Sequence, residues 1–221
     1  MATDTALYIF SIERKSIPFA FLQMAFGRNR ARKISGVTFA KLMGTGTGTT
    51  FTPSDADLQK WALLFVGDLS EIESSAFLAN WRTHSISEKR YHLRPLSSHG
   101  LWSGVQPFVV DQQNSTGAVA AITRARLKPR LAVKFWRSIP AVVADLHSQP
   151  GLIESFGIGE APIGLQGTFS IWVDGQSLRD FAYKGAAHQR VIDETAQFGW
   201  YSEELFARFE VLDTAEFTYV D

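Results

Sequence analysis

The two halves of the chain carry the same order of predicted elements, and this internal repeat constrains the fold more than any other feature. In the second half, strand-like runs lie at residues 118–127, 151–157, 167–173 and 204–212. Helical periodicity covers residues 131–147, with a kink at Pro140, and begins again near residue 176. The first half repeats this order, with strands at 7–12, 36–43, 61–66 and 89–93 and helices at 18–28 and 69–81. In this overlay, His84 lies at the position of His188.

The order β-α-β-β-α-β is that of the ferredoxin-like unit, whose antiparallel sheet has helices on one face only. The other face must be covered, and two such units in one chain can close their sheets against each other. We therefore predict an α+β fold of tandem ferredoxin-like repeats that form an α+β barrel, with a cavity between the sheets. The halves are residues 1–112 and 113–221. An unduplicated α+β domain whose halves look alike by chance is the alternative.

Alternation along the strands of the second half assigns their side chains to two faces. The more apolar set, which includes Phe169 and Ile171, is predicted to pack on the helices. The opposite set, predicted to face the cavity, includes Arg124, Ser170, Trp172, Phe206 and Arg208. A face of small, polar, aromatic and arginine residues suits a cofactor pocket. For any single arginine, an ion pair with Glu154 or Glu160 is the favoured alternative.

The chain contains no cysteine, which excludes disulfides, iron–sulfur clusters, zinc–thiolate sites and thiolate-ligated haem. An iron bound by this chain would need a histidine, tyrosine or methionine ligand. His188 is distinguished by its context, because Gly185, Ala186 and Ala187 leave the backbone beside it unobstructed, as a flat macrocycle requires. From these residues alone, a structural histidine remains the favoured interpretation.

The 22 basic and 22 acidic residues cancel, so the chain offers no electrostatic footprint for nucleic acid and no general attraction to anionic lipid. A local basic run at residues 28–33 is interpreted as a solvated helix end or loop rather than a binding site. No apolar run approaches the ~20 residues that span a bilayer, and residues 1–11 lack a signal-peptide pattern. We expect a cytoplasmic protein without stable membrane insertion.

Several stretches resemble spheroidene monooxygenases. They are residues 134–140 (Lys-Phe-Trp-Arg-Ser-Ile-Pro), 157–160 (Gly-Ile-Gly-Glu), 168–172, 199–209, 41–48, 51–53 and 100–104 (Gly-Leu-Trp-Ser-Gly). The resemblance covers most of the chain and keeps the motif order. None of these motifs is itself a catalytic signature, so they identify the family better than the reaction.

The resemblance implies a haem-dependent monooxygenase, holding haem b, that inserts oxygen into an apolar, carotenoid-like substrate. Aldoxime dehydratases and chlorite dismutases, which share the tandem barrel, hold haem in the C-terminal half on a helical histidine. The resemblance therefore makes His188 the expected iron ligand. Trp172 and Phe206, which the sheet-face argument places toward the cavity, are the further cofactor-binding candidates. The catalytic candidates Arg124, Ser170 and Arg208 rest on the sheet-face argument alone.

The chain has no flavin or nicotinamide motif, so a ferredoxin or similar electron donor is the expected partner, and a homodimer is possible. Two alternatives remain open. One is a haem-dependent lyase or dehydratase acting on a nitrogen compound such as an aldoxime. The other is a haem-free α+β barrel, either a cofactorless oxygenase or a binding protein.

Overall fold

A computed structural model describes residues 4–48, 53–110, 115, 117–131, 140, 142–161, 165–184 and 199–219. Eight strands form a closed barrel in the order β1-β3-β2-β6-β7-β5-β8-β4, and every neighbouring pair is antiparallel. The strands are β1 (Asp4–Ile12), β2 (Val37–Gly46), β3 (Ala56–Gly67), β4 (Ser85–Gly100), β5 (Val119–Leu127), β6 (Leu152–Gly159), β7 (Leu165–Trp172) and β8 (Tyr201–Thr218).

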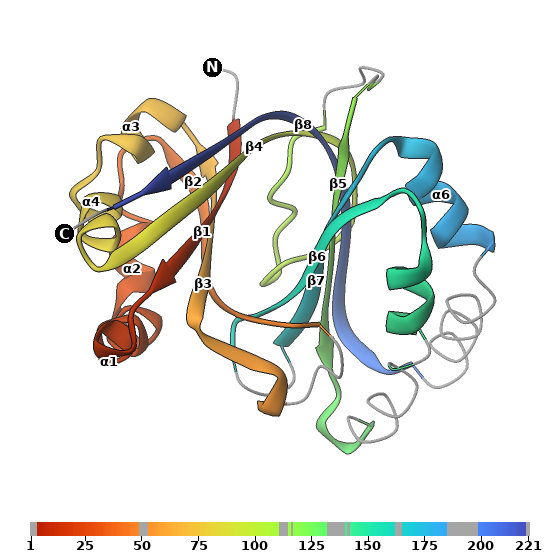
Figure 1. Cartoon of the computed structure of the whole chain (residues 1–221), viewed down its shortest axis with the longest axis horizontal. Coiled ribbons are helices and arrows are strands. Elements are labelled where there is room, and N and C mark those ends of the chain that lie inside the picture. Colours follow the sequence, from red (N-terminus) through yellow and green to blue (C-terminus); the bar gives the residue numbers. More distant parts are fainter. Residues whose placement is uncertain are drawn as a thin grey trace.

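Helices cover the barrel on two opposite sides (Figure 1). One side carries α1 (Ile17–Leu22), a π-helical turn (Gln23–Gly27), α2 (Arg28–Ala31), α3 (Leu69–Glu73) and α4 (Ala76–Thr83). The other side carries α6 (Gly175–Lys184) and the helical residues 142–148. This arrangement confirms the predicted fold class of tandem ferredoxin-like repeats in an α+β barrel. Most of the helix predicted at 131–147 lies outside the described residues.

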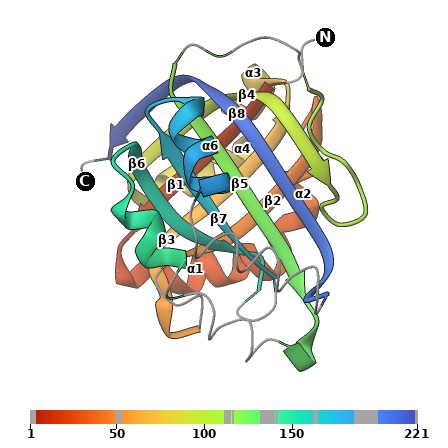
Figure 2. The same cartoon turned by 90° about the vertical axis from the view of Figure 1, so that its right-hand side faces the viewer.

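The two halves join along two seams of unequal length. β4 and β8 pair from Ser87↔Thr218 to Gly100↔Leu205, and they cross the molecule side by side in Figure 2. β2 and β6 pair only through residues 44–46 and 157–159. The long seam explains why β4 and β8 extend well beyond the strands predicted at 89–93 and 204–212.

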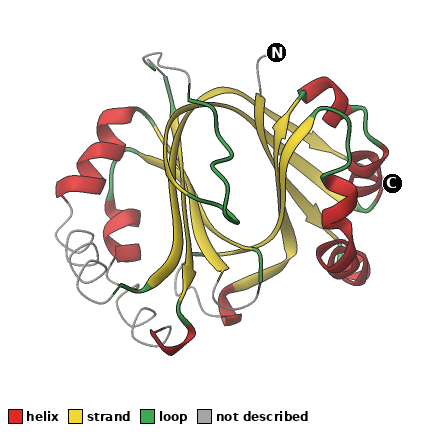
Figure 3. Cartoon of the chain, turned by 180° about the vertical axis from the view of Figure 1, so that it is seen from behind, coloured by secondary structure: helices red, strands yellow, loops and turns green. Residues whose placement is uncertain are grey.

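Apolar side chains from all eight strands fill the inside of the barrel. The segment between β4 and β5 runs into this space, as Figure 3 shows, and buries Trp102 and Phe108 there. Phe108 packs edge-on against Phe209, with ring centroids 4.8 Å apart, and Trp102 packs against Phe39 at 5.6 Å. The middle of the barrel is thus a packed core, and the prediction of a cavity between the sheets is wrong there.

A second core lies between the N-terminal sheet and its helices. Trp81 of α4 is its centre, with its ring centroid 5.5 Å from that of Phe10 and 5.3 Å from that of Phe19. The side chains of Asp68 and Ser75 cap the first turns of α3 and α4 by accepting backbone N–H bonds. These caps fix the residues at which the two helices begin.

Candidate functional site

The side chains predicted to line one cavity lie on two different faces of the C-terminal sheet. Arg124 of β5 points into the barrel and is buried, as predicted. On β8, Leu205, Ala207 and Phe209 belong to the barrel core, so the alternating residues of that strand face outward. The prediction that Ser170, Trp172, Phe206 and Arg208 face the barrel interior is therefore wrong, since all four lie on the helix side. The corresponding partners on β7, Phe169 and Ile171, lie in the barrel core instead of packing on the helices.

The outward-facing residues lie next to one another because of the strand register. Ala121 pairs with Ser170 on one side and with Arg208 on the other. In the next row, Thr123 pairs with Thr168 and Phe206. We call these six residues the outer C-terminal surface: Ala121, Thr123, Thr168, Ser170, Phe206 and Arg208. Small side chains predominate on it, and Thr123 and Phe206 are exposed.

Trp172 borders this surface and is fully buried between β7 and α6. Its ring stacks on Phe181 of α6, with centroids 5.3 Å apart, and its indole N–H donates a hydrogen bond to the Ser170 hydroxyl at 3.0 Å. The contact fixes the Ser170 oxygen while leaving its own hydroxyl hydrogen free to be donated elsewhere. Trp172 is thus an anchor that holds α6 on the sheet.

His188, the predicted iron ligand, lies outside the described residues, as do Gly185, Ala186 and Ala187. Its counterpart in the first half, His84, is described and follows α4. The His84 ring stacks on Phe19 with centroids 3.8 Å apart, and its Nδ1 lies 2.9 Å from the Asn80 carbonyl oxygen. This histidine is therefore held in a structural role. The described ranges hold no group of three or more histidine or acidic side chains suited to a metal ion.

Arg124 belongs to a buried charge cluster with Lys41, Glu160 and Glu203. Glu160 accepts hydrogen bonds from Lys41 Nζ at 2.6 Å and from Arg124 Nη2 at 3.2 Å. It also accepts one from the Trp102 indole at 2.6 Å. Arg124 reaches Glu203 through its other terminal nitrogen. The alternative interpretation of an arginine paired with Glu160 is confirmed for Arg124. Its guanidinium is therefore engaged in ion pairs with Glu160 and Glu203.

The charges of this cluster stabilise one another. Burial alone would raise the pKa of Glu160, but the hydrogen bonds and charges of Lys41 and Arg124 outweigh burial and hold that pKa below its usual value. Burial lowers the pKa of Lys41 in spite of its contact with Glu160. Burial would also raise the pKa of Glu203, yet the backbone N–H of Gly104 and the Arg124 guanidinium lower it.

Sequence reasoning missed Lys41, Trp102 and Glu203 as members of this cluster. A signal was present, because four of the stretches that resemble one family meet here: residues 41–48, 100–104, 157–160 and 199–209. The cluster joins β2 and the β4–β5 segment to β5, β6 and β8. A fully paired cluster of this kind ties the two halves together and offers no free acid or base.

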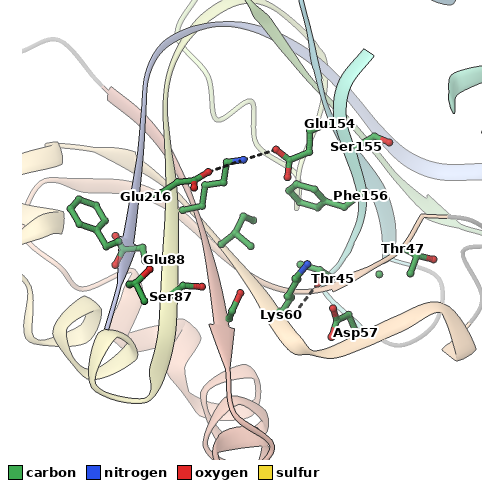
Figure 4. Close-up of a pocket in the computed structure, with 16 residues that line it drawn as sticks. Thr45, Thr47, Asp57, Lys60, Ser87, Glu88, Glu154, Ser155, Phe156 and Glu216 are labelled. Atoms are coloured by element: carbon green, nitrogen blue, oxygen red, sulfur yellow. Dashed lines mark hydrogen bonds and ion pairs between the residues drawn. The ribbon is translucent and has the colours of Figure 1, made fainter. Parts of the chain in front are cut away.

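A cavity of about 380 Å³ opens at the other ends of β4, β6 and β8 (Figure 4). Lys89 spans it, with its Nζ 2.8 Å from Glu154 and 3.2 Å from Glu216. Tyr91 donates a hydrogen bond to the same Glu154 carboxylate at 2.6 Å. The lining also includes Ile9, Phe156 and Phe217, so charged and apolar groups are mixed in this cavity.

No family model matches the chain. The spheroidene monooxygenase of Rhodobacter capsulatus is 36% identical to it over 208 residues, which cover 90% of this chain and 86% of that protein. The spheroidene monooxygenase of Cereibacter sphaeroides is 33% identical over 183 residues, or 80% and 56% of the two chains. Among solved structures, an aldoxime dehydratase in complex with butyraldoxime has a TM-score of 0.62 at 10% identity and covers 99% of this chain and 82% of its own. That likeness concerns the fold alone.

Proposed function

Because the chain belongs to the spheroidene monooxygenase family, we propose that it is an oxidoreductase that inserts oxygen into a carotenoid-like, apolar substrate. The observation that carries the proposal is the 36% identity over 90% of the chain. In each cycle one oxygen atom of O₂ enters a C–H bond and the other becomes water, with two electrons and two protons consumed. A ferredoxin or similar donor supplies the electrons.

We further propose that haem b is the cofactor, that residues of the outer C-terminal surface would hold it and that His188 would bind its iron. Bound there, haem supplies the activation of O₂ that a side chain cannot provide. The surface fits a flat ring, since Ala121, Thr123 and Thr168 keep their side chains short. Arg208 is half-buried and has no ion-pair partner within the described ranges, so its guanidinium is suited to a propionate carboxylate.

Ser170 is the polar group of this surface with a fixed position. The Trp172 indole occupies one lone pair of its oxygen, so the hydroxyl hydrogen remains to be donated to an oxygen above the sheet. Arg124 has no role in the proposed site, because it lies inside the barrel and is paired with Glu160 and Glu203.

The cofactor assignment is tested by His188→Ala in the haem-titrated protein. We expect the Soret band to be lost or shifted, with a cost in apoprotein stability of about 1 kcal/mol or less. Added imidazole should restore much of the spectrum by entering the vacated space. His84→Ala is the matched control and should leave the spectrum unchanged. Loss of the band in His84→Ala, with His188→Ala unaffected, would place the haem in the other half.

The reaction is tested with the purified protein, a ferredoxin, its reductase, O₂ and a carotenoid dispersed in detergent. We expect hydroxylated or keto products whose new oxygen derives from ¹⁸O₂. Turnover of an aldoxime without O₂ or reductant would identify a dehydratase instead. If the protein shows no Soret band after haem titration, the remaining interpretation is the haem-free α+β barrel.

A further inference from the structure

The solvent side of the first helical segment is apolar, which is the reverse of an ordinary surface helix. Across α1 and the π-helical turn, Pro18, Phe21, Leu22, Ala25 and Phe26 are exposed. Their spacing of three and four residues places them on one face. We call these five residues the apolar stripe. Phe21 is 49% exposed, Leu22 57% and Phe26 70%.

The opposite face of the same segment is fixed to the sheet. Ala20, Gln23, Gly27 and Ala31 are buried there. A Cβ atom on Gly27 would lie 3.2 Å from Leu42 and 3.4 Å from Phe77, so the helix already touches its neighbours. The apolar stripe therefore cannot turn inward, and it stays outside on the side of the barrel away from α6 (Figure 1).

Basic residues predominate around the stripe, although Lys15 pairs with Glu13 and Arg28 and Lys41 lie near Glu160. Residues 14–54 contain no acidic residue, and their basic residues are Arg14, Lys15, Arg28, Arg30, Arg32, Lys33 and Lys41. Arg32 and Lys33 are exposed directly after α2, and neither has an ion-pair partner in the part of the chain that the structure describes. Glu13 directly precedes this run and pairs with Lys15 at 2.9 Å, and Asp55 and Asp57 lie beside Arg14, all at the other end of the segment from Arg32 and Lys33. The chain as a whole is neutral, so its net charge does not reveal this local excess of basic residues.

From these observations we propose that the apolar stripe and the basic residues after it form a docking surface for an anionic lipid bilayer. A helix with exposed Phe and Leu flanked by cations lies in the interface plane, with its apolar side chains at the headgroup–acyl boundary. The cations draw it to anionic headgroups. Exposed cations lie beside the stripe, and this charge complementarity selects an anionic membrane as the occupant. No helix among the described residues is long and apolar enough to cross a bilayer, so this contact is peripheral.

The test is flotation of the full chain with vesicles of phosphatidylcholine containing 30% phosphatidylglycerol, against vesicles of phosphatidylcholine alone. We expect binding to the anionic vesicles and its loss when NaCl rises from 0.1 to 0.5 M, because salt shortens the Debye length. Leu22→Ser/Phe26→Ser should lower the partition coefficient about tenfold or more. Arg32→Gln/Lys33→Gln should lower it about fivefold for each cation, on anionic vesicles only.

Val109→Ser/Ile153→Ser is the matched control, since these side chains are 74% and 57% exposed on other segments. It should bind as the unaltered protein does, and circular dichroism checks that all variants are folded. Absence of binding, or an equal loss in the control, overturns the proposal. If Leu22→Ser/Phe26→Ser instead dissociates a dimer in light scattering while vesicle binding is unchanged, the stripe joins two copies of the chain. The readout does not involve turnover, so its failure leaves the proposed oxygenase untouched.

Discussion

The helix-facing surfaces of the two sheets occupy equivalent positions in the repeat but are built from different side chains. On the N-terminal sheet, Tyr8, Phe10, Leu63 and Phe65 are fully buried under helices anchored by Trp81. On the C-terminal sheet, the outer C-terminal surface is made mostly of small and polar residues. Its large members are Phe206 and Arg208, and the large Trp172, which borders it, is buried under α6.

This difference shows how a duplicated fold divides its tasks. Large apolar side chains under a helix contribute stability through burial and close packing. Small side chains on the equivalent surface give up part of that contribution. The N-terminal surface is thus the structural member of the pair, and the C-terminal surface is the one that we propose to bind the cofactor.

The largest expected effect is that of Trp81→Ala. The ring is fully buried between Phe10 and Phe19, so its removal leaves a cavity and should lower the free energy of unfolding by about 3–5 kcal/mol. Urea unfolding of the apoprotein measures it. A loss below about 1 kcal/mol would mean that the N-terminal surface is not the stabilising one.

Next comes Glu160→Gln, which tests whether the halves are independent. Without the Glu160 carboxylate, Lys41 and Arg124 lose a buried partner, and we expect a loss of about 3 kcal/mol in a single cooperative transition. The double variant Lys41→Met/Glu160→Gln should recover part of this loss, because one buried cation has gone. Two separate unfolding transitions in the unaltered protein would show that the cluster does not couple the halves.

Ser170→Ala should have a smaller effect on stability, about 1–3 kcal/mol, because it leaves the buried Trp172 N–H without its acceptor. The same variant should change the haem spectrum or the product yield, which Trp81→Ala should not. If Ser170→Ala alters stability alone, the hydroxyl serves only to hold Trp172. The two surfaces would then differ in packing but not in function.

The smallest expected effect concerns how the stability of the protein changes at low pH. Burial alone would raise the pKa of Glu73, but hydrogen bonds from Arg82, Arg90 and Tyr8 outweigh burial and lower it from 4.5. The unfolded chain then binds more protons, so stability is present above pH 4.5 and is lost as the pH falls through the folded-state pKa. Glu73→Gln, on the N-terminal helix side, should flatten this decline in unfolding experiments between pH 7 and pH 3. An unchanged slope would remove Glu73 as its source.

The element order could be predicted from the sequence because apolar periodicity is a local signal and the repeat presents it twice. The faces toward which the side chains of β7 and β8 point could not be predicted. In a closed barrel covered by helices, both faces of a strand are buried, so Phe169 and Ile171 carry no sign that distinguishes the barrel interior from the helix side. On β5 the assignment succeeded for Arg124, whose partners lie inside the barrel.

The buried charge cluster was beyond prediction for a different reason. Lys41 and Glu160 are 119 positions apart, and only closure of the barrel brings them within 2.6 Å. The role of His188 remains a prediction, since residues 185–198 lie outside the described part of the chain.

The closed strand order also has a consequence for the nascent chain. β1 to β4 leave the ribosome as a sheet whose inner side, with Leu7 and Leu64, is covered only by later residues. β8 then closes the ring by pairing with both β4 and β5. The 118 residues from the end of β4 at Gly100 to the end of β8 at Thr218 take roughly 6–24 s at a synthesis rate of about 5–20 residues per second. During that interval the first sheet has an unpaired edge and an uncovered apolar face, which are the features that expose a growing chain to aggregation.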